Sequence, residues 1–422
     1  MRKPNIAIIV LDTLREDHAQ GLDRLLDYGF VKYQNAIAPA PWTLPSHVSM
    51  LTGLYPSEHG IHEKKEISVH EKREIYVAKL AELSRIRMAK LADHNIITKK
   101  KDEGYTTYLI SANSWITPYT GFAADHNFHI DPLTNILYID DMYEIDREVR
   151  EYGGRIKFVL NNLKNLRLLQ KAAKLYITRR VKKIPKYLSE RAVMEKGART
   201  VLSLLEALNL QEPYLLFINI MEAHDPYTRL TRLKKFFCYI AEWLATGKIN
   251  PEAPKLWRNY PAHAKRATDR AVEIVATLAR KTKLDNTLVI ITADHGELLG
   301  NDGGLYHIYS LKDGNIRVPL YVKYPEGWKK KKQKTYIPLT DIPKILDPST
   351  DTIGSDLAIA ETFGVTHLGF QKCGLGNPPV NLFYHKIRIL GNKVDILFNK
   401  TLEQVEYAKS EQAQEVLRKL LY

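Results

Sequence analysis

Two apolar runs of the chain end in carboxylates. Asp12 follows the run from Ile6 to Leu11, and Asp294 with His295 follows the run from Thr287 to Thr292. A carboxylate at the end of a buried strand is unfavourable unless a cation or hydrogen-bond donors neutralise it. Two carboxylates and an imidazole supply oxygen and nitrogen ligands for one divalent ion. We therefore predict a metal site, although each aspartate alone is equally typical of a helix N-cap.

Thr43 begins a segment with the pattern of a short helix. Pro45 suits a first helical turn, and Gly53 suits the residue after the last turn. The N-terminus of such a helix favours an anion because its N–H groups are free and its dipole is positive there. We predict that Thr43 lies at an anion site, where a divalent ion would lower the pKa of its hydroxyl. The alternative is a plain helix cap.

The elements that must position these residues alternate between strands and helices. Four runs are short, continuous and rich in β-branched residues, which is typical of buried parallel strands: Ile6 to Leu11, Thr107 to Ser111, Tyr214 to Ile220 and Thr287 to Thr292. Helical periodicity lies between them, so we predict an α/β domain with a mostly parallel sheet and helices on both faces. Such sheets bind ligands at the carboxyl ends of their strands, where Asp12 and Asp294 stand.

The last part of the chain has a different pattern. Runs from Leu382 to Leu390 and from Lys393 to Phe398 flank Gly391-Asn392, which predicts a hairpin, and a helix is expected from Glu411 to Leu421. We therefore predict a catalytic domain over residues 1–334 and a small C-terminal α+β subdomain over residues 335–422.

The formal net charge of +14 predicts attraction to anionic partners. Residues 152–189 hold eleven Lys or Arg and no Asp or Glu, and their apolar residues recur every three to four positions, so we predict a basic helical insertion. Two interpretations stay open: a helix packed on the domain, or a contact with an acidic membrane surface through residues 155–187. Nothing specifically indicates nucleic acid.

The cysteines and the start of the chain bear on location. Cys238 and Cys373 are the two cysteines and lie far apart, so we expect two free thiols. No run approaches the roughly 20 apolar residues of a membrane span, and the first residues lack a signal pattern. We therefore expect a cytoplasmic protein, with peripheral binding to a membrane surface as an option.

Several motifs together resemble the sulfatase branch of the alkaline phosphatase superfamily. Thr43 to His47, followed by Leu51 to Gly53, is similar to the signature in which a cysteine or serine heads the pattern C/S-x-P-S-R. Asp12 and the pair Asp294-His295 fall where this family keeps metal ligands, and Arg317 to Pro319 is similar to its Arg-Val-Pro element. The resemblance extends over nearly the whole chain and implies an alkaline-phosphatase-like fold, with an anionic ester as substrate.

The resemblance also implies roles for residues outside the signature. His224 matches a histidine that contacts the transferred group or protonates the leaving oxygen, and His307 is a second acid–base or metal candidate. Asn113 and Trp115 follow the second predicted strand and are expected to line the pocket. Two further histidines, His59 and His62, are expected to be structural.

The departures from the family pattern change the expected chemistry. Formylglycine is made from cysteine or serine, so Thr43 excludes it. His47 replaces the arginine of the signature, where we expect it to bind substrate, and Thr13 replaces a second metal-binding aspartate. A metal-bound threonine is similar instead to the phosphodiesterases, phosphonate hydrolases and lipoteichoic acid synthases of the superfamily, in which the threonine attacks phosphorus.

We therefore expect cleavage of a phosphodiester or phosphonate, or phosphoryl transfer, through a covalent intermediate on Thr43. The metal ligands would be Asp12, Thr43, Asp294 and His295, holding one ion of Mn, Zn, Ca or Mg. A second ion, bound through His224, Asp225 or His307, is left open. Three alternatives remain: a sulfuric ester hydrolase without formylglycine, a phosphotransferase docked on a membrane, and an inactive binding protein that uses its basic surface.

Overall fold

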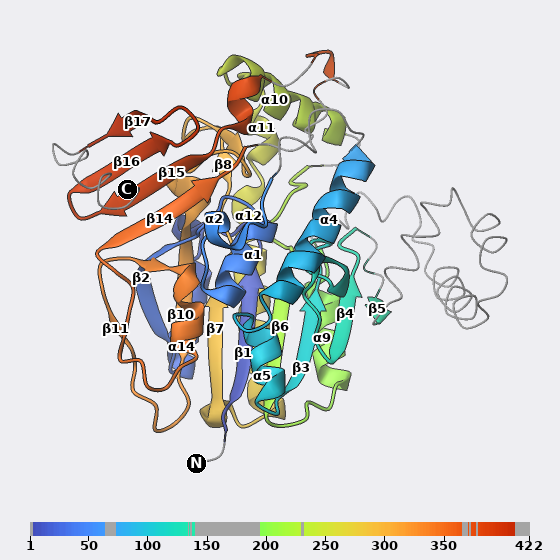
Figure 1. Cartoon of the computed structure of the whole chain (residues 1–422). Coiled ribbons are helices and arrows are strands. Elements are labelled where there is room, and N and C mark those ends of the chain that lie inside the picture. Colours follow the sequence, from blue (N-terminus) through green and yellow to red (C-terminus); the bar gives the residue numbers. More distant parts are fainter. Residues whose placement is uncertain are drawn as a thin grey trace.

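The computed structural model describes residues 3–63, 73–133, 135, 137–139, 195–228, 232–364, 370, 373–376 and 379–409. The predicted basic insertion over 152–189 and the predicted helix from Glu411 to Leu421 lie outside these residues. A nine-stranded sheet forms the centre of the molecule, in the order β12-β2-β10-β7-β1-β6-β3-β4-β5 (Figure 1).

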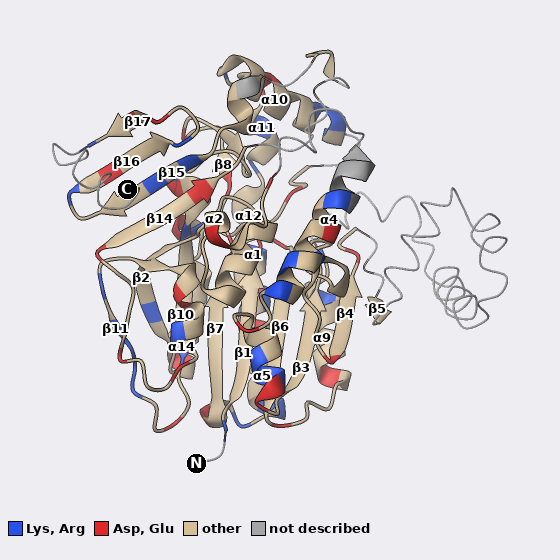
Figure 2. Ribbon diagram, viewed as in Figure 1, with Lys and Arg blue, Asp and Glu red and all other residues tan. Residues whose placement is uncertain are grey.

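The four central strands match the predicted ones. They are β1 (Asn5–Leu11), β3 (Thr106–Ser111), β6 (Tyr214–Ile220) and β7 (Thr287–Thr292). β1 pairs in parallel with both β6 and β7, and β6 pairs in parallel with β3. Every residue of β1, β6 and β7 is buried, and Figure 2 shows no charged residue in these three strands. Burial on both faces explains why they are continuous apolar runs rather than alternating ones.

The strands at the margins of the sheet pair in both parallel and antiparallel directions. β10 (Arg317–Lys323) runs antiparallel to β7 and to β2 (Val31–Ile37), and β12 (Ile337–Pro338) is parallel to β2. On the other side, β4 (His126–Ile130) is parallel to β3, and β5 (Leu137–Ile139) is antiparallel to β4. The parallel centre places four strand ends on one edge.

Helices lie on both faces of this sheet, as predicted (Figure 1). The helices in front are α1 (Thr43–Thr52), α4 (Arg73–Lys90) and α5 (Ile96–Asp102). Those behind are α9 (Ala198–Ala207) and α12 (Tyr260–Lys281), which contact each other. The other α-helices among the described residues are α2 (Pro56–His59), α10 (Leu233–Thr246), α11 (Pro254–Trp257), α13 (Asp313–Ile316) and α14 (Ile342–Ile345). None of the described helices is both long enough and apolar enough to span a membrane.

A separate antiparallel sheet forms the C-terminal subdomain. Its strands are β14 (Leu357–Thr362), β15 (Lys386–Gly391), β16 (Val394–Asn399) and β17 (Gln404–Ala408), paired in this order. The predicted hairpin is present, but its turn is Asn392-Lys393, one residue later than expected. Its first strand begins at Lys386 because residues Val380–Phe383 form a 3-10 turn. The boundary at residue 335 stays a prediction.

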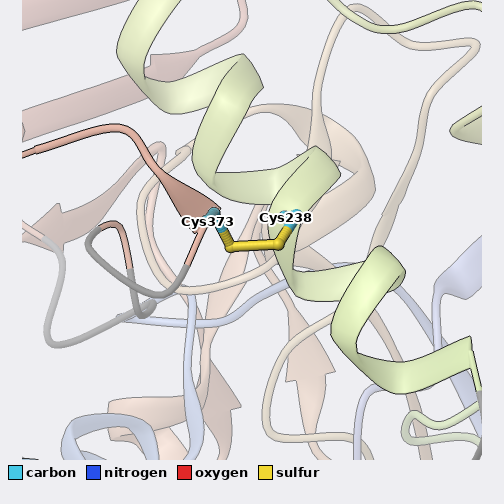
Figure 3. Close-up of a disulfide and its surroundings, with 2 residues drawn as sticks. All are labelled: Cys238 and Cys373. Atoms are coloured by element: carbon cyan, nitrogen blue, oxygen red, sulfur yellow. A yellow bond between two sulfur atoms is a disulfide. The ribbon is translucent and has the colours of Figure 1, made fainter.

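The prediction of two free thiols is wrong. Cys238 on α10 and Cys373 form a disulfide, with their Cα atoms 5.3 Å apart (Figure 3). Spacing along the chain did not reveal this bond because 135 residues separate the cysteines and only the fold brings them together. Persistent disulfides are uncommon in a reducing cytoplasm, so this bond does not support the expected location.

Candidate active site

Asp12 and Asp294 lie side by side because they follow the neighbouring strands β1 and β7. Both side chains are fully buried. The Oδ2 atom of Asp12 accepts hydrogen bonds from the amides of Asn113 (2.7 Å) and Asn219 (3.3 Å), and the Thr13 hydroxyl donates to its Oδ1 atom (3.0 Å). Donors therefore surround Asp12 on several sides.

The carboxylate of Asp294 receives fewer hydrogen bonds than that of Asp12. Its Oδ1 atom accepts the backbone N–H groups of Thr13 (3.2 Å) and His295 (3.0 Å). Its Oδ2 atom is buried without a hydrogen bond and lies 3.4 Å from the Nδ1 atom of His47 and 3.4 Å from the Nε2 atom of His295. A buried carboxylate oxygen without a donor is the contact that a cation would complete.

The electrostatics of the two aspartates agree with this geometry. Burial and the nearby charge of Asp12 raise the pKa of Asp294 to about 7. Burial also opposes ionisation of Asp12, but the charges of the surrounding histidines, with His224 foremost, outweigh it and lower the pKa of Asp12. Ligand atoms of Asp12, Asp294 and His295 all lie within 4.8 Å of one another. These three residues fit a divalent ion.

Thr43 is the first residue of α1, and its side chain points at this cluster. Its Oγ1 atom lies 3.4 Å from the Nε2 atom of His295 and 3.4 Å from the Nδ2 atom of Asn113. Trp42 occupies the N-cap position, so Thr43 is not the cap. The helix ends as predicted at Gly53, which adopts a left-handed conformation with φ 76°.

His47 is one turn further along α1 and is fully buried. Its Nδ1 atom lies 2.9 Å from the carbonyl oxygen of Thr43, and its Nε2 atom lies 3.3 Å from the Nδ2 atom of Asn219. Burial lowers the pKa of the imidazole. The structure thus places His47 beside the aspartates, and its contact with a substrate stays a prediction.

His224 follows β6 and approaches the cluster from a loop. Its Nδ1 atom lies 2.8 Å from the Oδ1 atom of Asp225, and its Nε2 atom lies 4.0 Å from the Oδ1 atom of Asp12. Burial opposes the charged imidazolium, but the two aspartates outweigh it and raise the pKa of His224 to about 10. A protonated His224 is therefore available beside Asp12.

His307 completes the group from a second loop. Its Nδ1 atom lies 2.8 Å from the Oε2 atom of Glu297, and its ring centre is 4.7 Å from that of His295 and 5.1 Å from that of His224. Burial lowers the pKa of His307. All eight predicted site residues therefore lie in one cluster: Asp12, Thr43, His47, Asn113, His224, Asp294, His295 and His307.

The remaining predicted residues are Trp115, His59 and His62. Trp115 packs edge-on against Trp42, with ring centres 5.6 Å apart, and its backbone N–H donates to the side chain of Asn113 (2.8 Å). His59 lies 3.1 Å from the hydroxyl of Ser49, and His62 stacks on a phenylalanine. Their contacts agree with the expected structural roles.

Three residues of the site were not predicted. Asn219 donates to Asp12, and Glu297 contacts His307. Lys196 is buried, and its Nζ atom donates to the carbonyl oxygen of His224. Asn219 was detectable as a polar residue within an apolar strand, and Glu297 as a second carboxylate after β7. No sequence signal connects Lys196 with this site.

This strand-end cluster of two aspartates, a histidine and a hydroxyl is accompanied by a family match. The sulfatase family model matches residues 4–347, and the chain belongs to this family of hydrolases. Solved structures with the same fold include a phosphonate monoester hydrolase from Silicibacter pomeroyi (15% identity, TM-score 0.59, covering 99% of this chain and 94% of that one). A putative sulfatase from Bacteroides fragilis is also similar (15% identity, TM-score 0.55, covering 96% and 88%).

Curated relatives match over shorter segments. A choline-sulfatase from Rhizobium meliloti (strain 1021) is 35% identical over 68 residues, which are 16% of this chain and 13% of that protein. An uncharacterized sulfatase from Escherichia coli (strain K12) is 25% identical over 150 residues, which are 31% of this chain and 30% of that protein. The matched segments thus span less than a third of each relative.

Proposed function

We propose that the protein is a metal-dependent hydrolase of phosphate esters, either phosphodiesters or phosphonates, with Thr43 as its nucleophile. The observation that carries the proposal is the position of the Thr43 hydroxyl. It lies at the N-terminus of α1 and only 3.4 Å from His295, which clusters with Asp12 and Asp294. A hydroxyl that served only structure would not need three buried ionisable groups around it.

Different residues of the chain would bind the metal ion, orient the nucleophile and stabilise the anionic substrate. A divalent ion at Asp12, Asp294 and His295 would lower the pKa of the Thr43 hydroxyl. The Nδ2 atom of Asn113 is near both Asp12 Oδ2 (2.7 Å) and Thr43 Oγ1 (3.4 Å), so this amide would orient the nucleophile relative to the carboxylate. The positive end of α1 would favour the negative charge on phosphorus-bound oxygens.

The reaction would proceed in two displacements. The Oγ1 atom of Thr43, after its proton has ionised to solvent, forms a bond to phosphorus while the bond from phosphorus to the ester oxygen breaks, and a histidine gives that oxygen its proton. His224 suits this role because it is protonated beside Asp12, and His307 is the alternative donor. Water, or an acceptor alcohol in a transferase, then attacks phosphorus and releases Thr43.

The second candidate is cleavage of a sulfuric ester. The choline-sulfatase match and the sulfatases among the structural neighbours favour it. We rank phosphate first because Thr43 cannot become formylglycine and because phosphonate monoester hydrolases share the fold. A binding protein without activity would not be expected to keep Asp12, Thr43, Asp294 and His295 together.

A substrate screen separates these functions. Nitrophenyl phosphate monoester, diester, phosphonate and sulfate would be offered with each of Mn, Zn, Mg and Ca to the wild type and to Thr43→Ala. We expect turnover of a phosphorus ester that Thr43→Ala loses by at least about 10³-fold. Activity that survives the loss of the hydroxyl would remove the nucleophile assignment, preferred turnover of the sulfate would favour the second candidate, and no turnover at all would favour the binding protein.

A further inference from the structure

Lys196 is a buried lysine next to the loop that carries His224. The loop comprises residues 221–227, and Lys196 lies just before α9 and is only 1% exposed. Removing an ammonium group from water is costly unless its partners compensate. A methionine would fill a similar volume without this cost, so the charged group of Lys196 is expected to do more than pack.

The Nζ atom of Lys196 contacts the loop at two points. It donates a hydrogen bond to the backbone carbonyl oxygen of His224 and lies 5.4 Å from the centre of the Tyr227 ring. A third contact, of 3.1 Å, is with the Nδ1 atom of His263 on α12. Burial lowers the pKa of His263 to about 3, so the Nδ1 atom of its neutral ring can accept from the ammonium group. Lys196 thus links the backbone of His224 to a helix behind the sheet.

Glu222 forms a second connection between the same two segments, in the opposite direction. It belongs to the loop, and its buried Oε1 atom accepts the backbone N–H groups of Lys196 (2.9 Å) and Ala198 (2.8 Å). Gly197 between them has a φ angle of 117°, a conformation that favours glycine. A side chain of the loop therefore holds the backbone before α9, while the side chain of Lys196 holds the backbone of the loop.

The imidazole of His224 is held separately from its backbone. The Oδ1 atom of Asp225 lies 2.8 Å from Nδ1, which leaves Nε2 on the side of Asp12, at 4.0 Å from its Oδ1 atom. Asp225 thus orients the ring, and Lys196 holds the carbonyl group of the same residue. We propose that Lys196 is a positioning residue, which keeps His224 where its Nε2–H group can reach the leaving oxygen.

This inference rests on the proposed function, in which His224 gives the leaving oxygen its proton. A residue that positions a proton donor should affect different esters unequally. The 4-nitrophenolate group leaves readily as an anion, whereas phenolate leaves readily only when a proton reaches its oxygen in the transition state. Loss of the Lys196 ammonium group should therefore slow cleavage of a phenyl ester more than that of a nitrophenyl ester. A lysine that only supported the fold would slow both alike.

The ratio of kcat/KM for the two esters tests the proposal. The 4-nitrophenyl and phenyl esters of the acid that the wild type cleaves would be assayed with the wild type and with Lys196→Met, which loses the ammonium group and keeps the apolar stem. We expect kcat/KM to fall by about 10²-fold for the phenyl ester and by less than about fivefold for the nitrophenyl ester.

Lys331→Met is the matched control. Lys331 is also buried, at 5% exposed, and its Nζ atom also donates to backbone carbonyl groups, those of Asp347 and Thr350, which are not part of the site. This variant should keep the wild-type ratio of the two esters. Lys196→Gln, which keeps an N–H donor, should give an intermediate ratio, so the test does not depend on the folding of Lys196→Met alone.

A double variant identifies the residue through which Lys196 acts. In His224→Ala the proton donor is already lost, so adding Lys196→Met should not change the ratio further. Equal slowing of both esters by Lys196→Met, or its full effect on the ratio in the His224→Ala background, would overturn the inference and leave the proposed function intact. Turnover that survives Thr43→Ala would instead overturn the proposed function, because the ratio does not depend on which group attacks phosphorus.

Discussion

Carboxylates occur in two contrasting settings in this molecule. In the C-terminal sheet, acidic side chains have basic partners: Asp395 forms two bonds of 2.9 Å with Arg388, and Glu406 lies 2.8 Å from Lys386. At the end of the large sheet, Asp294 keeps an oxygen without a donor. Figure 2 shows the opposite charges side by side on the C-terminal strands. The first arrangement pairs opposite charges within the chain, whereas the second leaves a buried oxygen for which we propose a cation as the partner.

The largest difference between the two settings should appear on neutralising Asp294. In Asp294→Asn the Oδ1 atom can still accept from Thr13 and His295, so the fold should persist, but the charge that would hold the proposed divalent ion is lost. We expect turnover to fall by at least about 10³-fold and the affinity for that ion to fall with it. Steady-state kinetics and metal titration would measure both. A variant with wild-type kinetics would mean that Asp294 is not a ligand.

The pH dependence of folding stability at Glu63 tests the same contrast, because this carboxyl is also buried and has no basic partner among the described residues. Burial raises the pKa of its carboxyl to about 8 from an ordinary value of 4.5, and its Oε1 atom has no hydrogen-bond partner. Because the pKa is raised in the folded state, the contribution of Glu63 to stability is complete below about pH 4.5. This contribution is lost as the pH rises towards 8, by about 1.4 kcal/mol for each pH unit within that range.

Glu63→Gln should therefore be less sensitive to pH than the wild type. Thermal unfolding at about pH 5 and about pH 8.5 would show a smaller difference in melting temperature for the variant. Other groups titrate in both proteins, so the comparison isolates Glu63. If the melting temperatures of the two proteins changed by the same amount between these pH values, Glu63 would not be a carboxyl with a raised pKa.

Asp395 should show the opposite behaviour, because its charge is paired. Asp395→Asn removes the double contact with Arg388, which keeps Asp313 at 2.7 Å and the carbonyl of Leu311 at 2.8 Å. We expect the free energy of unfolding in urea to fall by about 1–2 kcal/mol, with metal content and turnover unchanged. A loss of metal would show that the two regions are coupled more tightly than their contacts indicate.

Glu406 should give the smallest effect. Its side chain is about a third exposed and contacts both Lys386 and the amide of Asn399. Glu406→Gln can keep the amide contact and loses an ion pair that solvent screens, so the free energy of unfolding should change by less than about 1 kcal/mol. Urea titrations of this variant and of Asp395→Asn, run together, would rank the two pairs.

The sequence was informative where function coincides with regular structure. Continuous β-branched runs located the four central strands, and Asp12, Asp294 and His295 could be placed because they directly follow two of them. Thr43 could be placed because Pro45 and Gly53 bound its helix. The hairpin turn lies at Asn392-Lys393 and not at the predicted Gly391-Asn392. Both dipeptides contain Asn392, a residue type that suits turns, so the sequence did not fix the position to one residue.

Other parts depend on contacts between distant residues, which local patterns do not contain. Lys196 reaches the His224 loop only because the residues just before α9 pack against the end of β6. The pairing of Glu297 with His307 requires a loop held at unusual backbone angles. The family resemblance supplied His224 and His307, and it carried no information on the groups that hold them.

The disulfide would hold the chain together after cleavage by a protease. Cys238 and Cys373 enclose a covalent loop that contains Asp294, His295 and His307. A protease that cleaves one exposed turn inside this loop would produce two pieces that stay joined, so the nicked protein would migrate as one species until a reductant separates it. Asp294 and His295, two of the ligands that we propose for the metal ion, would then remain attached to the rest of the protein after its backbone had been broken.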